Sequence, residues 1–274
     1  MRVLLAQVAP RTHDVASNVE DACRLLYAYP DAELAVFPEL YVHAYALKGI
    51  VPLDLDLDLD GGGALTPLLA AARDTSTAVV VGVAERRGEG MANTALCIDE
   101  HGAAAGRYRK VQLFGAEHRY FLEGDEYLIA PLAGAAVGIL VCYDVEFPEP
   151  ARALASAGAE LVVTISANMD PYAEDHQLFL RVRALENGLP HVYVNCVGQE
   201  GRLRFCGGSG VADASGRLVA ALPAYRPDIR VVDVAVGAHG GGAPAYLADL
   251  RSGVPVRGGR SGDSRSRPTE SLQR

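Results

Sequence analysis

The sequence lacks several features that mark common classes of protein. Acidic residues outnumber basic ones by 34 to 25, so the net charge of −9 leaves no positive excess to hold phosphate backbones or anionic lipid. No apolar run approaches the roughly 20 residues of a membrane span, and the first residues lack the apolar stretch of a secretion signal. We therefore expect a soluble, cytoplasmic protein that binds neither nucleic acid nor membrane.

The cysteine residues form no recognisable motif. The five cysteines are an odd number, widely spaced, with no CxxC pair and no histidine at ligand spacing, so neither a disulfide framework nor a zinc site is indicated. The HExxH, P-loop and GxGxxG motifs are missing, and Val211 stands where a GxSxG motif needs its last glycine. We expect no metal and no organic cofactor.

Short apolar runs bounded by turn residues recur along the chain and indicate buried strands. They are Val3–Val8, Leu34–Phe37, Val79–Val83, Thr94–Ile98, Val137–Cys142, Leu161–Ile165, His191–Val197, Gly210–Ala212 and Arg230–Val236. Four segments between them have helical composition: Asn18–Tyr29, Pro67–Thr75, Pro150–Gly158 and Gln177–Asn187. The alternation predicts an α/β fold, and glycine turns after Thr94–Glu100 and Gly208–Asp213 predict hairpins, which argues against a purely parallel sheet.

Two stretches depart from this pattern. Leu53–Asp60 alternates leucine and aspartate, and its later aspartates match the opening of an EF-hand loop, but Pro67 stands where that loop needs a bidentate glutamate. A solvated loop or an edge strand is the favoured interpretation. From Ser252 the chain is rich in glycine, serine and arginine, so we expect one domain over residues 1–251 and a disordered tail over 252–274.

Three local strings carry residues with useful chemistry. Glu39 follows a strand in Phe37-Pro38-Glu39, Lys110 precedes a short apolar turn, and Cys142 ends a buried strand just before a helical segment. Taken singly, each has an ordinary explanation: an exposed strand-end glutamate, a solvated loop lysine and a structural core cysteine. Their joint appearance in this order is what indicates an active site.

The order and the flanking residues resemble the nitrilase superfamily, with its FPE, RK and CYDxxFPE contexts, over nearly the whole chain up to about Arg251. The resemblance implies a four-layer αββα sandwich with mixed β-sheets and no cofactor. It assigns Glu39, Lys110 and Cys142 to a catalytic triad, and Glu117 matches a further glutamate that many members hold near the lysine.

The chemistry of such a triad is direct. A nearby base and cation increase the thiolate character of a cysteine, so Glu39 accepting the Cys142 proton beside Lys110 makes an attacking sulfur. Lys110 and the backbone N–H of Tyr143 would then hold the oxyanion that forms on an amide carbonyl. Glu117 would position Lys110, and with three charges so close we expect one carboxyl pKa to be displaced.

The resemblance also bears on the substrate. True nitrilases usually carry Trp-Glu after the nucleophile, whereas this chain has Tyr143-Asp144 and no tryptophan, which indicates an amidase. The segment around Asn168 and Asp170 is similar to aliphatic amidases that act on ω-amino amides such as 5-aminopentanamide, and a 4-guanidinobutanamide would fit similarly. We expect Asn168 and Tyr143 to bind substrate and Asp170 to pair with its cationic end.

Two alternatives share these features. An N-carbamoyl amine or amino-acid hydrolase would use the same triad, and a non-catalytic α/β binding module would lack one of its members, although none is missing here. By the same resemblance we expect a homodimer or larger homo-oligomer, formed through Gln177–Asn187 and Tyr246–Arg251.

Overall fold

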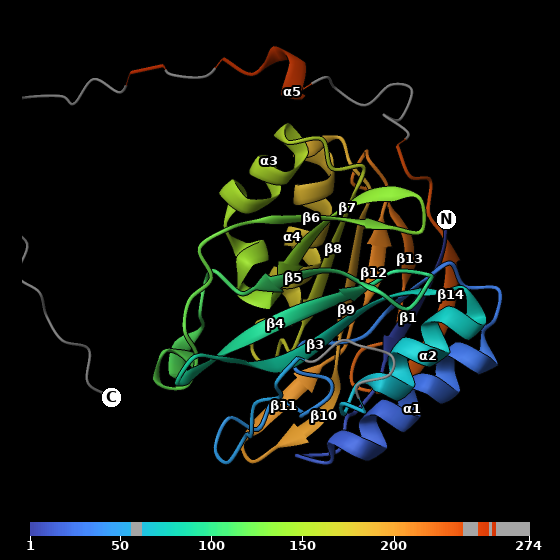
Figure 1. Ribbon diagram of the computed structural model, residues 1–274. Helices are drawn as coiled ribbons and strands as arrows, with labels where there is room; N and C mark the ends of the chain where they lie inside the picture. The colour runs from blue at the N-terminus through green and yellow to red at the C-terminus, as the bar shows by residue number, and fades with distance from the viewer. Residues whose placement is uncertain (56–61, 238–245, 252–253, 256–274) are drawn as a thin grey trace, which may run out of the picture.

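The computed structural model describes residues 1–55, 62–237, 246–251 and 254–255, and these form four layers (Figure 1). Two six-stranded sheets pack face to face within this part of the chain, and helices cover both outer faces. The expected αββα sandwich is confirmed.

The first sheet is mixed, with strands β1, β2 and β3 parallel and the others antiparallel. Its order is β14 (Asp228–Asp233), β1 (Arg2–Gln7), β2 (Leu34–Val36), β3 (Ala78–Arg87), β4 (Gly90–Ile98) and β5 (Ala104–Arg109). Helices α1 (Val15–Ala28) and α2 (Thr66–Thr75) cover its outer face.

The second sheet is mixed in the same way, with β7, β8 and β9 parallel at its centre. Its order is β13 (Leu218–Ala221), β12 (Gly210–Ala212), β9 (His191–Asn195), β8 (Leu161–Ser166), β7 (Ala135–Val141) and β6 (Leu128–Leu132). Helices α3 (Pro148–Ser156) and α4 (Ala173–Asn187) cover it, and the short α5 (Tyr246–Asp249) lies against α4. A separate ribbon pairs β10 (Val197–Glu200) with β11 (Leu203–Cys206).

The central strands are apolar throughout because both of their faces are covered. On β1, Val3 and Leu5 face the opposite sheet, whereas Leu4 and Ala6 pack under α1 and α2. Successive side chains of a strand point to opposite faces, so a strand buried on both sides has no polar alternation. This is why the sequence shows these strands as continuous apolar runs.

Each expected strand and helix is found; β12 has the expected ends, and the others are shifted at one end or both. The expected strand His191–Val197 is in fact two, because β9 ends at Asn195 and Val197 begins the separate ribbon. The sequence did not indicate β6, whose Pro131 and partly exposed residues are typical of an edge strand. Strand β7 ends at Val141, one residue before Cys142.

Two expectations fall largely outside the described residues. Leu53 bridges to Glu85 beside β3, but residues 56–61, which hold the later aspartates of the Leu/Asp alternation, are not described. The same applies to residues 252–253 and 256–274, most of the expected tail. Among the helices that the structure does describe, none has the length and apolar character needed to cross a membrane.

Candidate active site

Three strand ends bring the expected triad together. Glu39 follows β2, Lys110 follows β5 and Cys142 follows β7; β2 and β7 lie among the parallel strands of their sheets, whereas β5 pairs antiparallel with β4. The Lys110 Nζ lies 2.7 Å from Glu39 Oε1, and both side chains are completely buried. Cys142 is 9% exposed, which leaves its sulfur within reach of a ligand in the adjoining pocket.

Glu39 is held from both sheets. Its Oε1 accepts a hydrogen bond from Asn93 Nδ2 at 2.7 Å, and its Oε2 accepts the backbone N–H of Ala167 at 2.8 Å. Gly82 on β3 makes room for the loop that carries it, because a Cβ there would stand 2.2 Å from the backbone nitrogen of Leu40. Only glycine allows this approach.

Lys110 is shared between two carboxylates. Its Nζ also lies 2.9 Å from Oε1 of Glu117, which stands in the 3₁₀ turn Gly115–Arg119. Glu117 in turn accepts the hydroxyl hydrogen of Tyr45 at 2.7 Å and the backbone N–H of Phe114 at 2.8 Å. The structure therefore places the fourth expected residue beside the lysine, with all three charged groups buried.

Burial and mutual charge displace the pKa values of these groups. Burial raises the pKa of Glu39, with Lys110 acting in the opposite direction. Burial acts to lower the pKa of Lys110, but Glu117 and Glu39 together raise it well above its usual range. Burial and Glu39 raise the pKa of the Cys142 thiol, against Lys110. The direction of the Glu39 shift suits a general base.

The nucleophile candidate has an unusual backbone. Cys142 begins the 3₁₀ turn Cys142–Glu146 with φ of +47°, a left-handed conformation that costs a non-glycine residue about 1–3 kcal/mol. The buried Asp144 stabilises this turn, because it accepts the backbone N–H of Val141 at 3.0 Å, that of Gln112 at 2.9 Å and the hydroxyl of Tyr108 at 2.8 Å. Asp144 therefore ties the cysteine turn to the lysine loop.

A small pocket opens over Cys142. Its lining combines aromatic, polar and charged side chains: Tyr45, Phe114, Cys142, Tyr143, Glu146, Asn168, Met169, Tyr172 and His176. Tyr143 and Asn168 line it, as the sequence predicts for substrate-binding residues. The amide of Asn168 also shapes the wall, since its Nδ2 donates to the Tyr172 carbonyl at 3.0 Å and its Oδ1 accepts the Met169 N–H at 2.9 Å.

Asp170 differs from the expectation. It does not line the pocket, and its carboxylate instead accepts the hydroxyl of Tyr225 at 2.6 Å, with Arg204 at 3.8 Å. The carboxylate that does line the pocket belongs to Glu146, four residues after the cysteine. Sequence reasoning missed Glu146 because the direction of a side chain in a 3₁₀ turn cannot be inferred from a motif.

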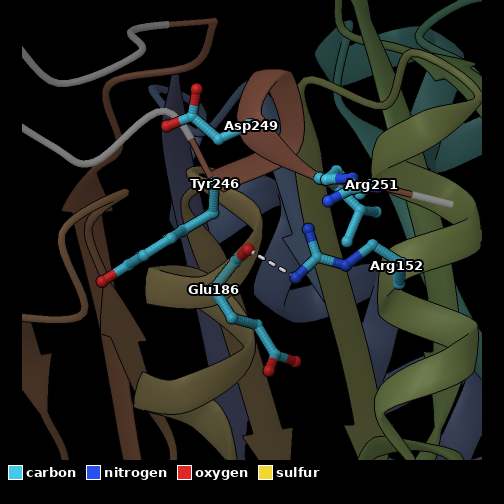
Figure 2. A pocket seen from close by; sticks show the side chains of 6 residues that line it. Arg152, Glu186, Tyr246, Asp249 and Arg251 are labelled. Atoms are coloured by element: carbon cyan, nitrogen blue, oxygen red, sulfur yellow. Dashed lines mark hydrogen bonds between the residues drawn. The ribbon is translucent and has the colours of Figure 1, made fainter. Parts of the chain in front are cut away.

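A second hollow, with none of the lining residues of the first, lies between α3, α4 and α5 (Figure 2). Arg152, Glu186, Tyr246, Asp249, Leu250 and Arg251 line it. Arg152 Nη2 donates to the backbone carbonyl of Glu186 at 2.7 Å (Figure 2). The two segments expected to mediate pairing thus meet on one surface.

Known proteins resemble the chain over most of its length. The model of the family described as carbon-nitrogen hydrolase matches residues 2–239. An (R)-stereoselective amidase from a Pseudomonas species is 37% identical over 85% of this chain and 84% of its own. A hydrolase from the pqqF 5′ region of Pseudomonas protegens is 37% identical over 80% and 78%. The crystal structure of an amidase from Nesterenkonia matches with a TM-score of 0.79 and 34% identity, over 92% of this chain and 93% of that one.

Proposed function

The chain belongs to the carbon–nitrogen hydrolase family and is an amidase, and from that premise we propose that Cys142 is the nucleophile that opens a small aliphatic primary amide. The observation that carries the proposal is the buried Glu39–Lys110–Glu117 cluster beside a cysteine at the base of a pocket. In a variant of the Nesterenkonia amidase, acrylamide has added to the active-site cysteine, which supports the same role for a cysteine here.

The first half-reaction forms a thioester. Glu39 takes the thiol proton of Cys142 as the sulfur bonds to the amide carbon, and the carbonyl oxygen becomes an oxyanion. Lys110 and the backbone N–H of Tyr143 stabilise that charge. Glu39 then returns the proton to the amide nitrogen, the carbon–nitrogen bond breaks and ammonia leaves.

The second half-reaction restores the enzyme. Water attacks the thioester carbon and Glu39 accepts its proton. The carbon–sulfur bond then breaks, the carboxylic acid leaves, and Glu39 passes the proton to the Cys142 sulfur, which restores the thiol and the carboxylate. Lys110 serves both steps without leaving its position, because Glu39 and Glu117 hold it at 2.7 Å and 2.9 Å. Each step uses only groups of this chain, the amide and water.

The finer proposal concerns the charge of the substrate. Four aromatic rings line the pocket (Tyr45, Phe114, Tyr143 and Tyr172), which favours a short aliphatic chain, and a Nesterenkonia amidase variant was solved with butyramide. Glu146 adds a carboxylate to the pocket wall, where it could pair with an ammonium or guanidinium group at the far end of the amide. We therefore propose a preference for cationic ω-amino or guanidino amides, with Glu146 in the place that the sequence suggested for Asp170.

An ammonia-release assay over short amides tests both the hydrolysis of aliphatic amides and the preference for cationic ones. We expect turnover of pentanamide, and a higher kcat/KM for 5-aminopentanamide or 4-guanidinobutanamide. Glu146→Gln should remove that preference while pentanamide is still hydrolysed, and Asp170→Asn, which alters a carboxylate outside the pocket, is the matched control. Equal kcat/KM for charged and neutral amides in the wild-type enzyme would contradict the cationic preference alone. Carbon dioxide released together with ammonia would indicate an N-carbamoyl hydrolase instead.

We also propose that copies of the chain pair through α4 and α5. These elements carry exposed apolar side chains, Leu178 at 57%, Tyr246 at 45% and Leu250 at 55%, which a symmetric partner would cover. Light scattering on the purified protein should report a dimer or larger assembly. Leu178→Glu together with Leu250→Glu should reduce the mass toward that of one chain, and an unchanged mass would place the interface elsewhere.

A further inference from the structure

One neutral side chain hydrogen-bonds both carboxylates of the buried cluster. Asn93, near the start of β4, is completely buried, and its Nδ2 lies 2.7 Å from Oε1 of Glu39 and 3.4 Å from Oε1 of Glu117. Its backbone carbonyl accepts the backbone N–H of Lys110 at 2.8 Å, which joins β4 to the strand end that carries the lysine. A single residue therefore contacts all three charged residues of the cluster.

The alternation along β4 directs Asn93 toward the opposite sheet. Ala95 and Cys97 belong to the core between the two sheets, and Asn93 lies on the same face of the strand, two residues before Ala95. The neighbouring Thr94 points the other way and donates to the Glu85 carboxylate at 2.9 Å. The inner face of β4 is thus apolar until it reaches the site, where its next member is an amide.

The orientation of the Asn93 amide follows from the charge on its partner. The proposed function needs Glu39 ionised before the thiol gives up its proton, and both oxygens of an ionised carboxylate are acceptors only. The contact of 2.7 Å with Glu39 Oε1 therefore requires the amide nitrogen of Asn93, not its oxygen, to face the carboxylate. That nitrogen carries two hydrogens, so it can donate to Glu39 and to Glu117 at once.

Counting hydrogen bonds shows what Asn93 does to Glu39. Each carboxylate oxygen offers two acceptor sites. Those of Oε1 are filled by Lys110 Nζ and Asn93 Nδ2, both at 2.7 Å, whereas Oε2 accepts the backbone N–H of Ala167 at 2.8 Å. Among the residues that the structure describes, no second donor reaches Oε2. A proton can therefore bind Oε2 without displacing a neighbour, whereas Oε1 would first have to lose a hydrogen bond.

We propose that Asn93 is a positioning residue of the reaction, whose side-chain amide keeps Glu39 ionised and in place until the Cys142 thiol gives up its proton. The inference rests on the proposed function, in which Glu39 is the general base. Asn93 acts through Glu39 and transfers no proton itself. The bonds that form and break are those of the proposed function, and Asn93 only donates hydrogen bonds.

The surroundings of Glu39 explain the need for this donor. Burial raises the pKa of Glu39, and the negative charge of Glu117 acts in the same direction, whereas Lys110 and the Asn93 hydrogen bond oppose them. Lys110 cannot serve Glu39 alone, because it is shared with Glu117. A second cation would hold Glu39 so strongly ionised that it would become a weak base, and a neutral amide avoids this.

The pH profile of turnover tests the proposal. Asn93→Leu keeps the branched shape of the side chain and removes its donors, so the acid limb of kcat/KM should move to higher pH by about one unit, the scale for one hydrogen bond to a charged group. The direction follows because a carboxylate that loses a donor to its ionised form binds a proton at higher pH. Asn93→Ala, which leaves space instead of an apolar group beside the carboxylates, should move the limb in the same direction.

Thr94→Val is the matched control. Thr94 is the next residue of β4, its hydroxyl donates to the buried carboxylate of Glu85 outside the site, and valine preserves its shape. The acid limb should stay at the wild-type pH in this variant, even where stability falls.

Alkylation of Cys142 by iodoacetamide gives a second readout that requires no amide turnover. Mass spectrometry of the Cys142 peptide measures the alkylation rate over the same pH range. Because Glu39 takes the thiol proton in both reactions, the acid limb of alkylation should move in the Asn93 variants together with that of kcat/KM.

The outcomes separate this proposal from the proposed function. A merely structural role of Asn93 would lower the plateau of kcat/KM without moving the limb, so an acid limb at the wild-type pH in both Asn93 variants would overturn the proposal. An equal shift in Thr94→Val would overturn it as well. Wild-type protein that keeps its amidase activity after full alkylation of Cys142 would instead contradict the proposed function, so the two failures are distinguishable.

Discussion

The first sheet positions Glu39 and Lys110, and the second positions the Cys142 sulfur together with the Glu146 carboxylate of the pocket wall. Glu39 and Lys110 follow strands of the first sheet, are fully buried and have every polar atom engaged with a neighbour. Cys142 follows a strand of the second sheet in a left-handed conformation, beside a pocket. Glu39 and Lys110, the charged half of the site, are therefore held in one arrangement before substrate arrives. Cys142, in the second half, is the residue that faces the substrate.

This difference has a physical basis. A buried ion pair is stable only when further hydrogen bonds satisfy both partners, so its geometry tolerates little change. A strained backbone, by contrast, is stabilised by the surrounding turn, here through the three hydrogen bonds that Asp144 accepts. Substitutions in the second half should therefore change chemistry more than stability, and substitutions among the buried charges should change both.

The largest expected effect is on activity, and it comes from replacing Cys142, which follows a strand of the second sheet. Cys142→Ala removes the attacking atom and little volume, so ammonia release should fall to the background rate while thermal unfolding changes only slightly. Cys97→Ala is the matched control, because its thiol is fully buried in the core between the sheets and should affect stability but not kcat. If Cys142→Ala retains activity, or if Cys97 proves essential, the nucleophile is misassigned.

The next largest effect is expected among the buried charges, and it should appear both in amide turnover and in the free energy of unfolding. Lys110→Gln should lower kcat at least about a hundredfold, the scale for one oxyanion donor, with a smaller effect on KM. It also leaves Glu39 and Glu117 buried without their cation, which should destabilise the protein by about 3–5 kcal/mol in urea unfolding at pH 7. A change confined to KM would reassign Lys110 to substrate binding, and unchanged stability would remove the contrast between the two halves.

The smallest expected effect is on the pH dependence of stability. It involves two buried histidines, His43 in the loop after β2 and His191 on β9. Burial lowers the pKa of His43 from 6.5 to about 4 and that of His191 from 6.5 to about 3. Between pH 6.5 and those values the unfolded chain binds a proton that the folded protein does not, so stability falls as the pH drops, by at most about 1.4 kcal/mol per pH unit for each histidine. Above pH 7 neither residue contributes to the slope.

The histidine effect is isolated by a difference measurement. Glu39 and Asp144 act in the opposite sense, since burial raises their pKa values, that of Asp144 to about 6. The free energy of unfolding should therefore be compared between wild type and His43→Asn at pH 7, 6 and 5. Asparagine can keep an acceptor for the Ala84 N–H, which His43 Nδ1 accepts at 3.2 Å, and the variant should lose less stability on acidification. Parallel curves would show that His43 is not held neutral by burial.

Much of the fold follows from local pattern. Strands covered on both faces appear as apolar runs, and β12 begins and ends where the sequence predicts, at Gly210 and Ala212. Errors arise where local pattern is weak: β6 contains a proline, and β11 has only four residues, half of them exposed. No local signal separates β9 from β10, because the break at Cys196 depends on which strand each segment pairs with.

The sequence by itself determined which residues could carry the chemistry. Glu39, Lys110 and Cys142 each stand just after a strand in a distinctive string, and the resemblance carried by those strings assigned them together to one catalytic triad. Only the tertiary structure decided which groups surround them. Glu146 rather than Asp170 lines the pocket, Gly82 admits the Glu39 loop, and hydrogen bonds join His176 to Tyr193 and Tyr193 to Ser166. These are contacts between distant segments, and the direction of a side chain across such a contact is set by packing, which a linear pattern does not encode.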